Sequence, residues 1–199
     1  MGARGWIILV IALVAMGLAL FVVDFPRCTS DEMAPGIRKA DLLLACRVCG
    51  PPRPGDLVLF TSPDNGPLSI RRVVAVPGDR VEVHKGVTLV NGKPLEGSDG
   101  GTLKLDDIDP VSKQPRPFAL TVEKSGTHEY RVVSDLGVAS SGDRPPETLG
   151  DSYFVVADRR TLVRDSRDYG PIKSASVRSI VLRVLSAGDH DEARQAKVP

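Results

Sequence analysis

The chain has 199 residues, enough for one domain of ordinary size with an additional anchor or tail. Its 26 Lys and Arg residues balance 25 Asp and Glu residues, and the two signs are mixed along the chain, which argues against nucleic acid or an acidic substrate as a partner. With 16 Pro, 19 Gly and only 5% aromatic residues, the composition favours short strands and turns over a helical bundle.

One long apolar run lies near the start of the chain, at residues 6–23, and contains 18 uncharged residues. As a helix it would rise about 27 Å, close to the hydrocarbon thickness of a bilayer. The alternative is a cleaved secretory signal, whose apolar region is only about 7–15 residues long and precedes a small-residue cleavage site. The segment Asp24-Phe25-Pro26-Arg27 provides no such site. We therefore expect residues 6–23 to form a transmembrane helix.

The short tail at residues 1–5 sets the expected orientation. Because Arg4 precedes the apolar run, the positive-inside rule places the N-terminus in the cytoplasm. Residues 24–187 then form the main domain on the periplasmic or extracytoplasmic side. The protein is expected to be a single-pass protein of the inner (plasma) membrane, with the lipid bilayer as a partner.

Cysteine usage permits that compartment. Cys46 and Cys49 form a C-x-x-C pair, which indicates a structural disulfide or a chance pair, and Cys28 is left over. A redox site would need a strand–helix context, whereas residues 50–52 read Gly-Pro-Pro. A zinc site is not expected, because there is no second cysteine pair and the histidines are scattered, at His84, His128 and His190.

Beyond the apolar run, short apolar segments alternate with turn residues. They predict strands at residues 57–60, 70–76, 81–83, 87–90, 130–133, 153–156 and 177–185. Asn91-Gly92 is typical of a hairpin turn. Residues 96–116 are polar and rich in Gly and Asp, so we expect a loop insertion there, and residues 188–199 are expected to be a flexible tail. The predicted fold is all-β, with a partly open barrel or sheets.

Four ordered segments carry a family resemblance. They are residues 29–35 (TSDEMAP), 53–60 (RPGDLVLF), 70–79 (IRRVVAVPGD) and 153–160 (YFVVADRR), the last continuing to 165–170 (DSRDYG). In this order behind an apolar N-terminal run, over residues 1–185, they resemble the boxes of type I signal peptidases. The resemblance implies an exoplasmic β-domain that docks on the membrane. It also implies cleavage of secretory signal peptides after small residues by a serine nucleophile and a lysine base, without metal or cofactor.

Three positions depart from the family pattern. The first family box, Ser-x-Ser-Met-x-Pro, corresponds to residues 30–35, so Glu32 stands where the nucleophile belongs and Ser30 where a serine helps to form the oxyanion hole. Arg71 stands at the lysine base, and Val163 at the serine that orients that base. The last box keeps its charged residues, which we expect to form a structural network of ion pairs beneath the site: Asp158, Arg160, Asp165 and Arg167.

The chemistry of these departures argues against peptidase activity. Attack by Glu32 on an amide would give a mixed anhydride that readily reverts, so a carboxylate is a poor substitute for the serine hydroxyl. Arg71 cannot act as a base, because the pKa of a guanidinium lies above about 12. Val163 lacks the hydrogen bond that would orient a base. We expect Glu32 and Arg71 to form a bidentate ion pair in place of the former dyad.

Other nucleophiles are less favoured. A shift to Ser30 would break the spacing of the first box, and Cys28 has no histidine near the boxes to activate its thiol. Paired-carboxylate chemistry, with Glu32 beside Asp31 or Asp158, is a further alternative. The leading hypothesis is an inactive, membrane-anchored signal peptidase homologue that binds signal-peptide-like segments or serves as a subunit of a membrane complex. The alternatives are an active signal peptidase I and, least favoured, a redox protein.

Overall fold

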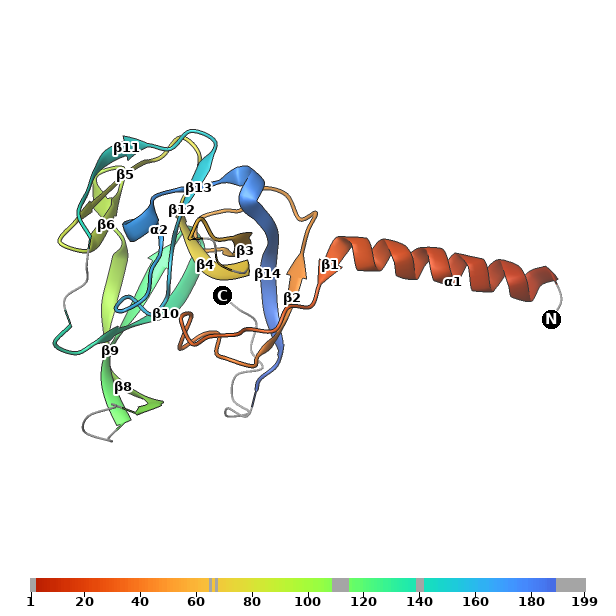
Figure 1. The fold of residues 1–199 in the computed structure, drawn as a ribbon, viewed down its shortest axis with the longest axis horizontal. Coiled ribbons are helices and arrows are strands. Elements are labelled where there is room, and N and C mark those ends of the chain that lie inside the picture. Colours follow the sequence, from red (N-terminus) through yellow and green to blue (C-terminus); the bar gives the residue numbers. More distant parts are fainter. Residues whose placement is uncertain (1–2, 65, 67, 109–114, 139–141, 189–199) are drawn as a thin grey trace.

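The structure is a computed structural model that describes residues 3–64, 66, 68–108, 115–138 and 142–188. Figure 1 shows a β-domain from which one helix, α1 (Ala3–Val22), projects. In the rest of the described chain, helical structure is confined to α2 (Ser166–Tyr169) and to a 3-10 turn, η1 (Ser174–Ser176). The prediction of a β-domain is therefore confirmed.

The helix α1 coincides closely with the apolar run at residues 6–23. The side chains of residues 14–16 and 18–20 are not among those described. Within the described residues, no helix is long and apolar enough to cross a membrane. The transmembrane helix and its orientation therefore stay predictions.

The largest sheet has seven strands, and each of its neighbouring pairs is antiparallel. Two of its strands, at residues 57–61 and 152–156, are buried on both faces, which explains why they are apolar at consecutive positions rather than at alternate ones. In spatial order the seven strands are β1 (Val23–Asp24), β2 (Leu42–Cys46), β14 (Val177–Ser186), β3 (Leu57–Thr61), β4 (Leu68–Ala75), β12 (Ser152–Val156) and β13 (Ile172–Lys173).

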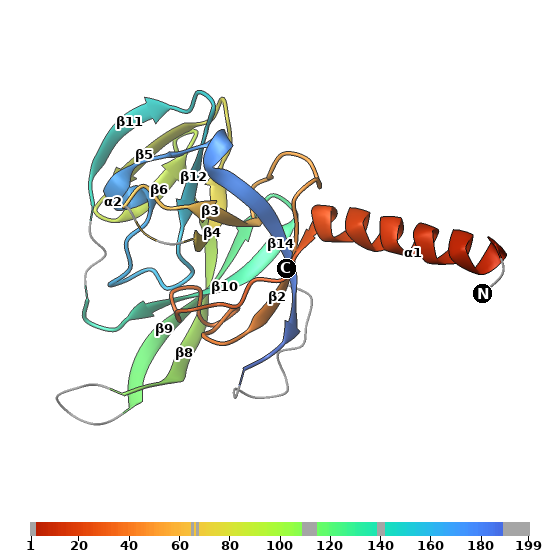
Figure 2. The ribbon, with the colours of Figure 1, turned by 45° about the vertical axis from the view of Figure 1, so that its right-hand side comes forward.

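Two smaller sheets complete the domain. One has the order β11 (Arg144–Thr148), β5 (Arg80–His84), β6 (Val87–Val90) and β7 (Lys93–Pro94). The other has the order β10 (His128–Asp135), β9 (Pro115–Ser125) and β8 (Glu96–Ile108). The end of its β8–β9 hairpin extends away from the body of the domain in both views (Figures 1 and 2).

The prediction of a loop at residues 96–116 is wrong for most of that range, because residues 96–108 form β8 and β9 begins at Pro115. Residues 109–114 lie outside the described residues. The glycines that suggested a loop instead allow β8 to approach β9 closely. A Cβ added to Gly97 would lie 2.9 Å from Cγ2 of Thr121, and one added to Gly100 would lie 2.9 Å from Cγ of Leu120.

The predicted flexible tail falls mostly at residues 189–199, which are also outside the described residues. Its first residue, Gly188, donates its backbone N–H to Oδ1 of Asp41 at 2.9 Å. The end of the described chain is therefore attached to the turn that precedes β2.

The loop between β1 and β2, which carries Glu32, is fixed to the domain from two sides. Met33 and Ile37 are 2% and 1% exposed and pack in a core cluster with Leu43 of β2. Burying such a side chain contributes about 1.5–3 kcal/mol. On the other side, the backbone N–H of Arg159 donates to the carbonyl oxygen of Glu32 at 3.1 Å. The position of Glu32 is therefore set by the core and by the segment after β12.

Asp24 joins α1 to the β-domain through two arginines. Arg47 donates a hydrogen bond to Oδ1 of Asp24, and Arg178 donates from Nε and Nη2 at 3.0 and 3.1 Å. Arg47 lies between Cys46 and Cys49, which form a disulfide. The hydrogen bond from Arg47 is the largest influence on the pKa of Asp24, which falls to about 2 although burial opposes the change.

We predict that Asp24→Asn lowers the free energy of unfolding at pH 6 and has little effect near pH 2. The carboxylate has a folded-state pKa below its ordinary value of 3.8, so its stabilisation is present above about pH 4 and is lost as the pH falls toward 2. Urea unfolding between pH 2 and pH 7 would measure the difference. Asp151→Asn, at an exposed position, is the control. Equal, pH-independent decreases in the free energy of unfolding of both variants would contradict the prediction.

Candidate functional site

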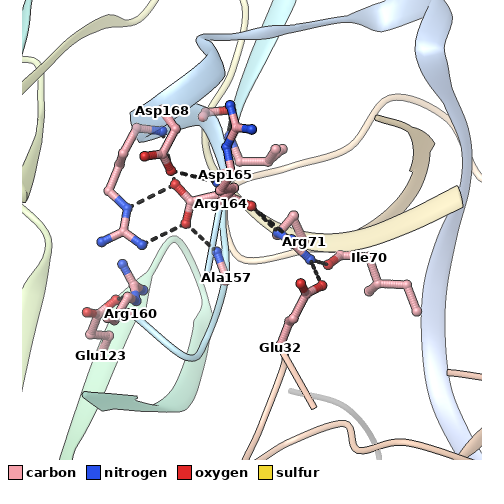
Figure 3. A network of polar contacts seen from close by, with 12 residues as sticks. Glu32, Ile70, Arg71, Glu123, Ala157, Arg160, Arg164, Asp165 and Asp168 are labelled. Atoms are coloured by element: carbon pink, nitrogen blue, oxygen red, sulfur yellow. Dashed lines mark hydrogen bonds and ion pairs between the residues drawn. The ribbon is translucent and has the colours of Figure 1, made fainter. Parts of the chain in front are cut away.

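Glu32 and Arg71 are in direct contact, as the sequence predicts. Arg71 lies on β4 with a side chain only 6% exposed, and Glu32 reaches it from the β1–β2 loop with a side chain 40% exposed. The distance between Nη1 of Arg71 and Oε2 of Glu32 is 3.0 Å (Figure 3). A single N–H makes this contact, so the expected bidentate geometry is wrong.

Three of the other N–H groups of Arg71 are bound to backbone carbonyls, which explains the single contact. Nε and Nη2 donate to the carbonyl oxygen of Arg164 at 3.3 and 2.9 Å, and Nη1 also donates to that of Ile70 at 2.8 Å. Four of the five N–H groups that a guanidinium offers are thus occupied. Arg71 is held as a fixed, buried cation, and a fork-to-fork pair with Glu32 is not available to it.

Ser30 contacts the same carboxylate oxygen. Its hydroxyl donates to Oε2 of Glu32 at 3.1 Å. Cys28 lies behind it and donates its thiol to the carbonyl oxygen of Ser30 at 3.1 Å. Burial raises the pKa of the Cys28 thiol, which makes the thiolate form needed for nucleophilic attack less accessible. The structure therefore gives no support to Cys28 as a nucleophile.

Val163 lies in the segment between β12 and α2, where it packs against the core cluster that contains Met33 and Leu59. An apolar side chain at this position fills space and accepts no hydrogen bond from Arg71. The orienting role that the family resemblance assigns to this position is taken by a backbone atom of the next residue, the carbonyl oxygen of Arg164.

A cavity of about 950 Å³ lies beside the Glu32–Arg71 pair. Apolar side chains form part of its wall, among them Met33, Leu59 and Ile70. Its charged lining includes an ion pair between Arg164 and Asp64, with 3.3 Å between Nη2 and Oδ1. The cavity is thus a partly apolar groove that runs past a charged centre.

Beneath the groove, Arg72 and Asp158 form a bidentate ion pair. Their side chains are 2% and 1% exposed, and the two N–H···O distances are 2.8 and 2.7 Å. Arg72 also donates from Nη1 to the carbonyl oxygen of Gly55 at 2.7 Å and lies 3.9 Å from the ring centroid of Tyr130. These contacts compensate the charge of Arg72, which would otherwise be costly to bury in a low-dielectric interior.

The remaining charged residues of the last box take part in two further ion pairs. Asp165 binds Arg167 through two hydrogen bonds of 2.9 and 2.7 Å, and it also caps α2 and accepts the backbone N–H of Ala157 at 3.0 Å. Arg160 instead contacts Glu123 on β9 at 2.5 Å (Figure 3). These contacts fit the predicted structural role of the charged residues.

Sequence reasoning missed two important partners. The carbonyl oxygen of Arg164 holds Arg71, and no side-chain pattern could reveal a backbone acceptor. Glu123 lies 37 residues from Arg160 in the chain, in a strand whose existence the sequence did not predict. Both omissions concern contacts that depend on tertiary structure alone.

Comparison with known proteins agrees with the resemblance. A family model described as signal peptidase, peptidase S26, matches residues 3–184. The chain is 37% identical over 101 residues to a probable signal peptidase I-1 of Synechocystis sp., covering 45% of this chain and 52% of the relative. It is 32% identical over 93 residues to a signal peptidase I of Leptolyngbya laminosa, covering 41% and 46%. The chain therefore spans about half the length of these relatives.

Among solved structures, the chain is similar to the crystal structure of a signal peptidase I from Enterococcus faecalis V583. The two are 24% identical with a TM-score of 0.35, and the match covers 66% of this chain and 97% of the other.

We predict that Asp158→Asn lowers the free energy of unfolding by about 3–5 kcal/mol, because it leaves the buried Arg72 without its counter-ion. Urea unfolding of the full chain in detergent would measure the loss. Asp64→Asn is the matched control, since it breaks the more exposed pair with Arg164 and should cost less than about 1 kcal/mol. Similar decreases in the free energy of unfolding of Asp158→Asn and Asp64→Asn would contradict the prediction.

Proposed function

The chain belongs to the signal peptidase family, peptidase S26, and we propose that it is a member without peptidase activity that binds an extended peptide or a subunit of a membrane complex. One observation carries the proposal. Arg71, at the position that the resemblance assigns to the general base, is buried and donates four hydrogen bonds.

The chemistry of the site supports this proposal. A general base must accept a proton, and a guanidinium that is ionised at any physiological pH and bound to three acceptors cannot do so. Glu32 is held against this cation and offers no hydroxyl for acyl transfer. Val163 is packed into the core cluster. Restoring the dyad would therefore require changes at several positions.

The groove supports a role in binding. Its volume of about 950 Å³ and its mixed apolar and polar lining suit a short extended peptide. Peptides that bind in this way add main-chain hydrogen bonds to a strand edge and place alternate side chains in pockets. We propose signal-peptide-like segments, or a segment of a membrane-complex subunit, as the occupant.

We also propose that α1 anchors the protein in the lipid bilayer, with the β-domain on the periplasmic or extracytoplasmic side. From Gly5 to Val22 the sequence of α1 contains no charged residue, and 20 residues of helix rise about 30 Å. Large apolar side chains of α1 are exposed, among them Trp6, Ile8 and Ile11 at 59%, 68% and 62%. A bilayer would cover this surface.

A second function is favoured by one specific contact. The hydrogen bond from Ser30 to Glu32 places a hydroxyl beside a carboxylate, the arrangement in which a carboxylate can activate a serine. An active serine peptidase would then use Ser30 as nucleophile and Glu32 as base. Against this, the oxygen that would accept the proton already accepts a hydrogen bond from Arg71.

We predict that the full chain gives no product from a peptide with an Ala-x-Ala signal cleavage site. Glu32→Ser alone should also be inactive, because the base is still an arginine, whereas activity in Glu32→Ser/Arg71→Lys/Val163→Ser would show that the fold still supports the chemistry. Mass spectrometry of the peptide after incubation would measure cleavage.

Cleavage by the unmodified chain would overturn the proposal. If Ser30→Ala and Glu32→Gln each abolished that cleavage, the second function would be established. Asp64→Asn, at another charged residue of the groove wall, controls for indirect effects of removing a charge.

We predict that the full chain stays in the membrane fraction after alkaline carbonate extraction, and that Ile11→Arg/Leu13→Arg is released. Each arginine at the centre of a span costs about 2.5–3.5 kcal/mol of insertion free energy. Val87→Arg/Leu136→Arg, at similarly exposed positions of the β-domain, is the matched control and should stay in the membrane fraction. Extraction of the wild type by carbonate would contradict the proposed anchor.

A further inference from the structure

Leu162, in the segment between β12 and α2, has two features that are unusual for a leucine. Its backbone φ is +60°, in the left-handed region that glycine and asparagine adopt more readily than a bulky apolar residue. It is also 68% exposed, and it is one of the residues that line the groove beside the Glu32–Arg71 pair. A strained backbone and an exposed apolar side chain both cost free energy, so their combination at the groove needs an explanation.

The residues just before Leu162 are fixed to β10. Arg160 donates its backbone N–H to the carbonyl oxygen of Val133 at 2.7 Å. Thr161 is 2% exposed, and its hydroxyl oxygen accepts the backbone N–H of Asp135 at 2.7 Å. The same hydroxyl donates to Oδ2 of Asp135 at 2.5 Å. The chain therefore reaches Leu162 from a position that β10 determines.

The residues just after Leu162 are fixed to the core and to β4. Val163 packs against the core cluster that contains Met33. The carbonyl oxygen of Arg164 accepts hydrogen bonds from Nε and Nη2 of Arg71. Because both flanking segments are attached, Leu162 has to turn the chain between them. This constraint accounts for the left-handed conformation, but it does not account for a leucine at this position.

The apolar surroundings of the groove give a reason for the leucine. Asparagine tolerates the left-handed region, as Asn91 does in this chain at a φ of +52°. Only an apolar side chain would add to the apolar surface of the groove, where a second leucine, Leu68, is 39% exposed. The buried Met33 and Ile70 also line the groove. The groove thus keeps exposed apolar surface that a ligand could cover.

We propose that Leu162 determines the specificity of the groove by packing against a large apolar side chain of the bound peptide. The inference rests on the proposed peptide-binding function and adds the class of side chain that is bound. A large apolar side chain removes more of the surface of Leu162 from water than a small one does. This preference differs from the small residues that the family resemblance implies at the cleavage site.

The test measures binding of two fluorescein-labelled peptides to the full chain in detergent by fluorescence anisotropy. The first is Ser-Ala-Leu-Thr-Leu-Ala-Ser-Thr, whose two leucines lie on the same side of an extended chain, and the second has alanine in place of both. Leu162→Asn should weaken binding of the leucine peptide about tenfold and change binding of the alanine peptide by less than about twofold. Leu162→Met keeps a large apolar side chain and should retain the affinity of the wild type for both peptides.

Two controls separate this role from a structural one. Leu182→Asn, at an exposed leucine that is not part of the groove lining, should bind both peptides like the wild type. Urea unfolding of Leu162→Asn should have a midpoint at least as high as that of the wild type, because asparagine tolerates the left-handed conformation. A lower midpoint together with weaker binding of both peptides would show that Leu162 only holds the loop, and would overturn the inference.

The failure of the inference can be distinguished from the failure of the proposed function. If the wild type binds the peptides and Leu162→Asn changes the two affinities equally or not at all, the inference is overturned while peptide binding by the groove stands. If the wild type binds neither peptide, peptide binding by the groove is overturned and the role of Leu162 with it.

Discussion

The buried ion pair between Arg72 and Asp158 is the contact on which the arrangement of the site depends. Through it β4 is connected to the end of β12, and the further bond to Gly55 and the contact with Tyr130 add the turn before β3 and the strand β10. Successive side chains of a strand point to opposite faces. Because Arg72 is directed toward Asp158, its neighbour Arg71 is directed toward the groove and Glu32. The Arg72–Asp158 pair thus determines where the Glu32–Arg71 pair lies.

Arg71 and Arg72 are both buried, but their hydrogen-bond partners differ. Arg72 has a complete bidentate partner and is removed from solvent. Arg71 is almost as buried, yet its main acceptors are backbone carbonyls, and its carboxylate partner is 40% exposed to the groove. A peptide in the groove would therefore encounter the edge of Glu32 before Arg71. Binding energy at this centre would come from contacts with a charged pair already in place, and no proton transfer would be needed.

Much of the fold could be predicted from the sequence, because apolar segments and turn residues repeat at short intervals. The strands around residues 57–60, 70–76 and 153–156 are found close to their predicted bounds. The hairpin of β8 and β9 could not be predicted, since its glycines serve close strand packing rather than a loop. In the site, the contact could be predicted because the family resemblance places positions 32 and 71 at neighbouring dyad positions and their charges are opposite. Its geometry was not predictable, because the carbonyl oxygen of Arg164 competes for the same guanidinium.

The hairpin has a mechanical consequence for the site. Ala34, two residues after Glu32, packs in one core cluster with Leu105 of β8, Phe118 of β9 and Val133 of β10. Close-packed interiors have low compressibility and transmit strain. The β8–β9 hairpin is therefore packed, through this cluster, against the loop that carries Glu32. A force applied to the outer end of the hairpin, for instance by a neighbouring protein, would be transmitted through this cluster to the loop that carries Glu32, and so to the groove.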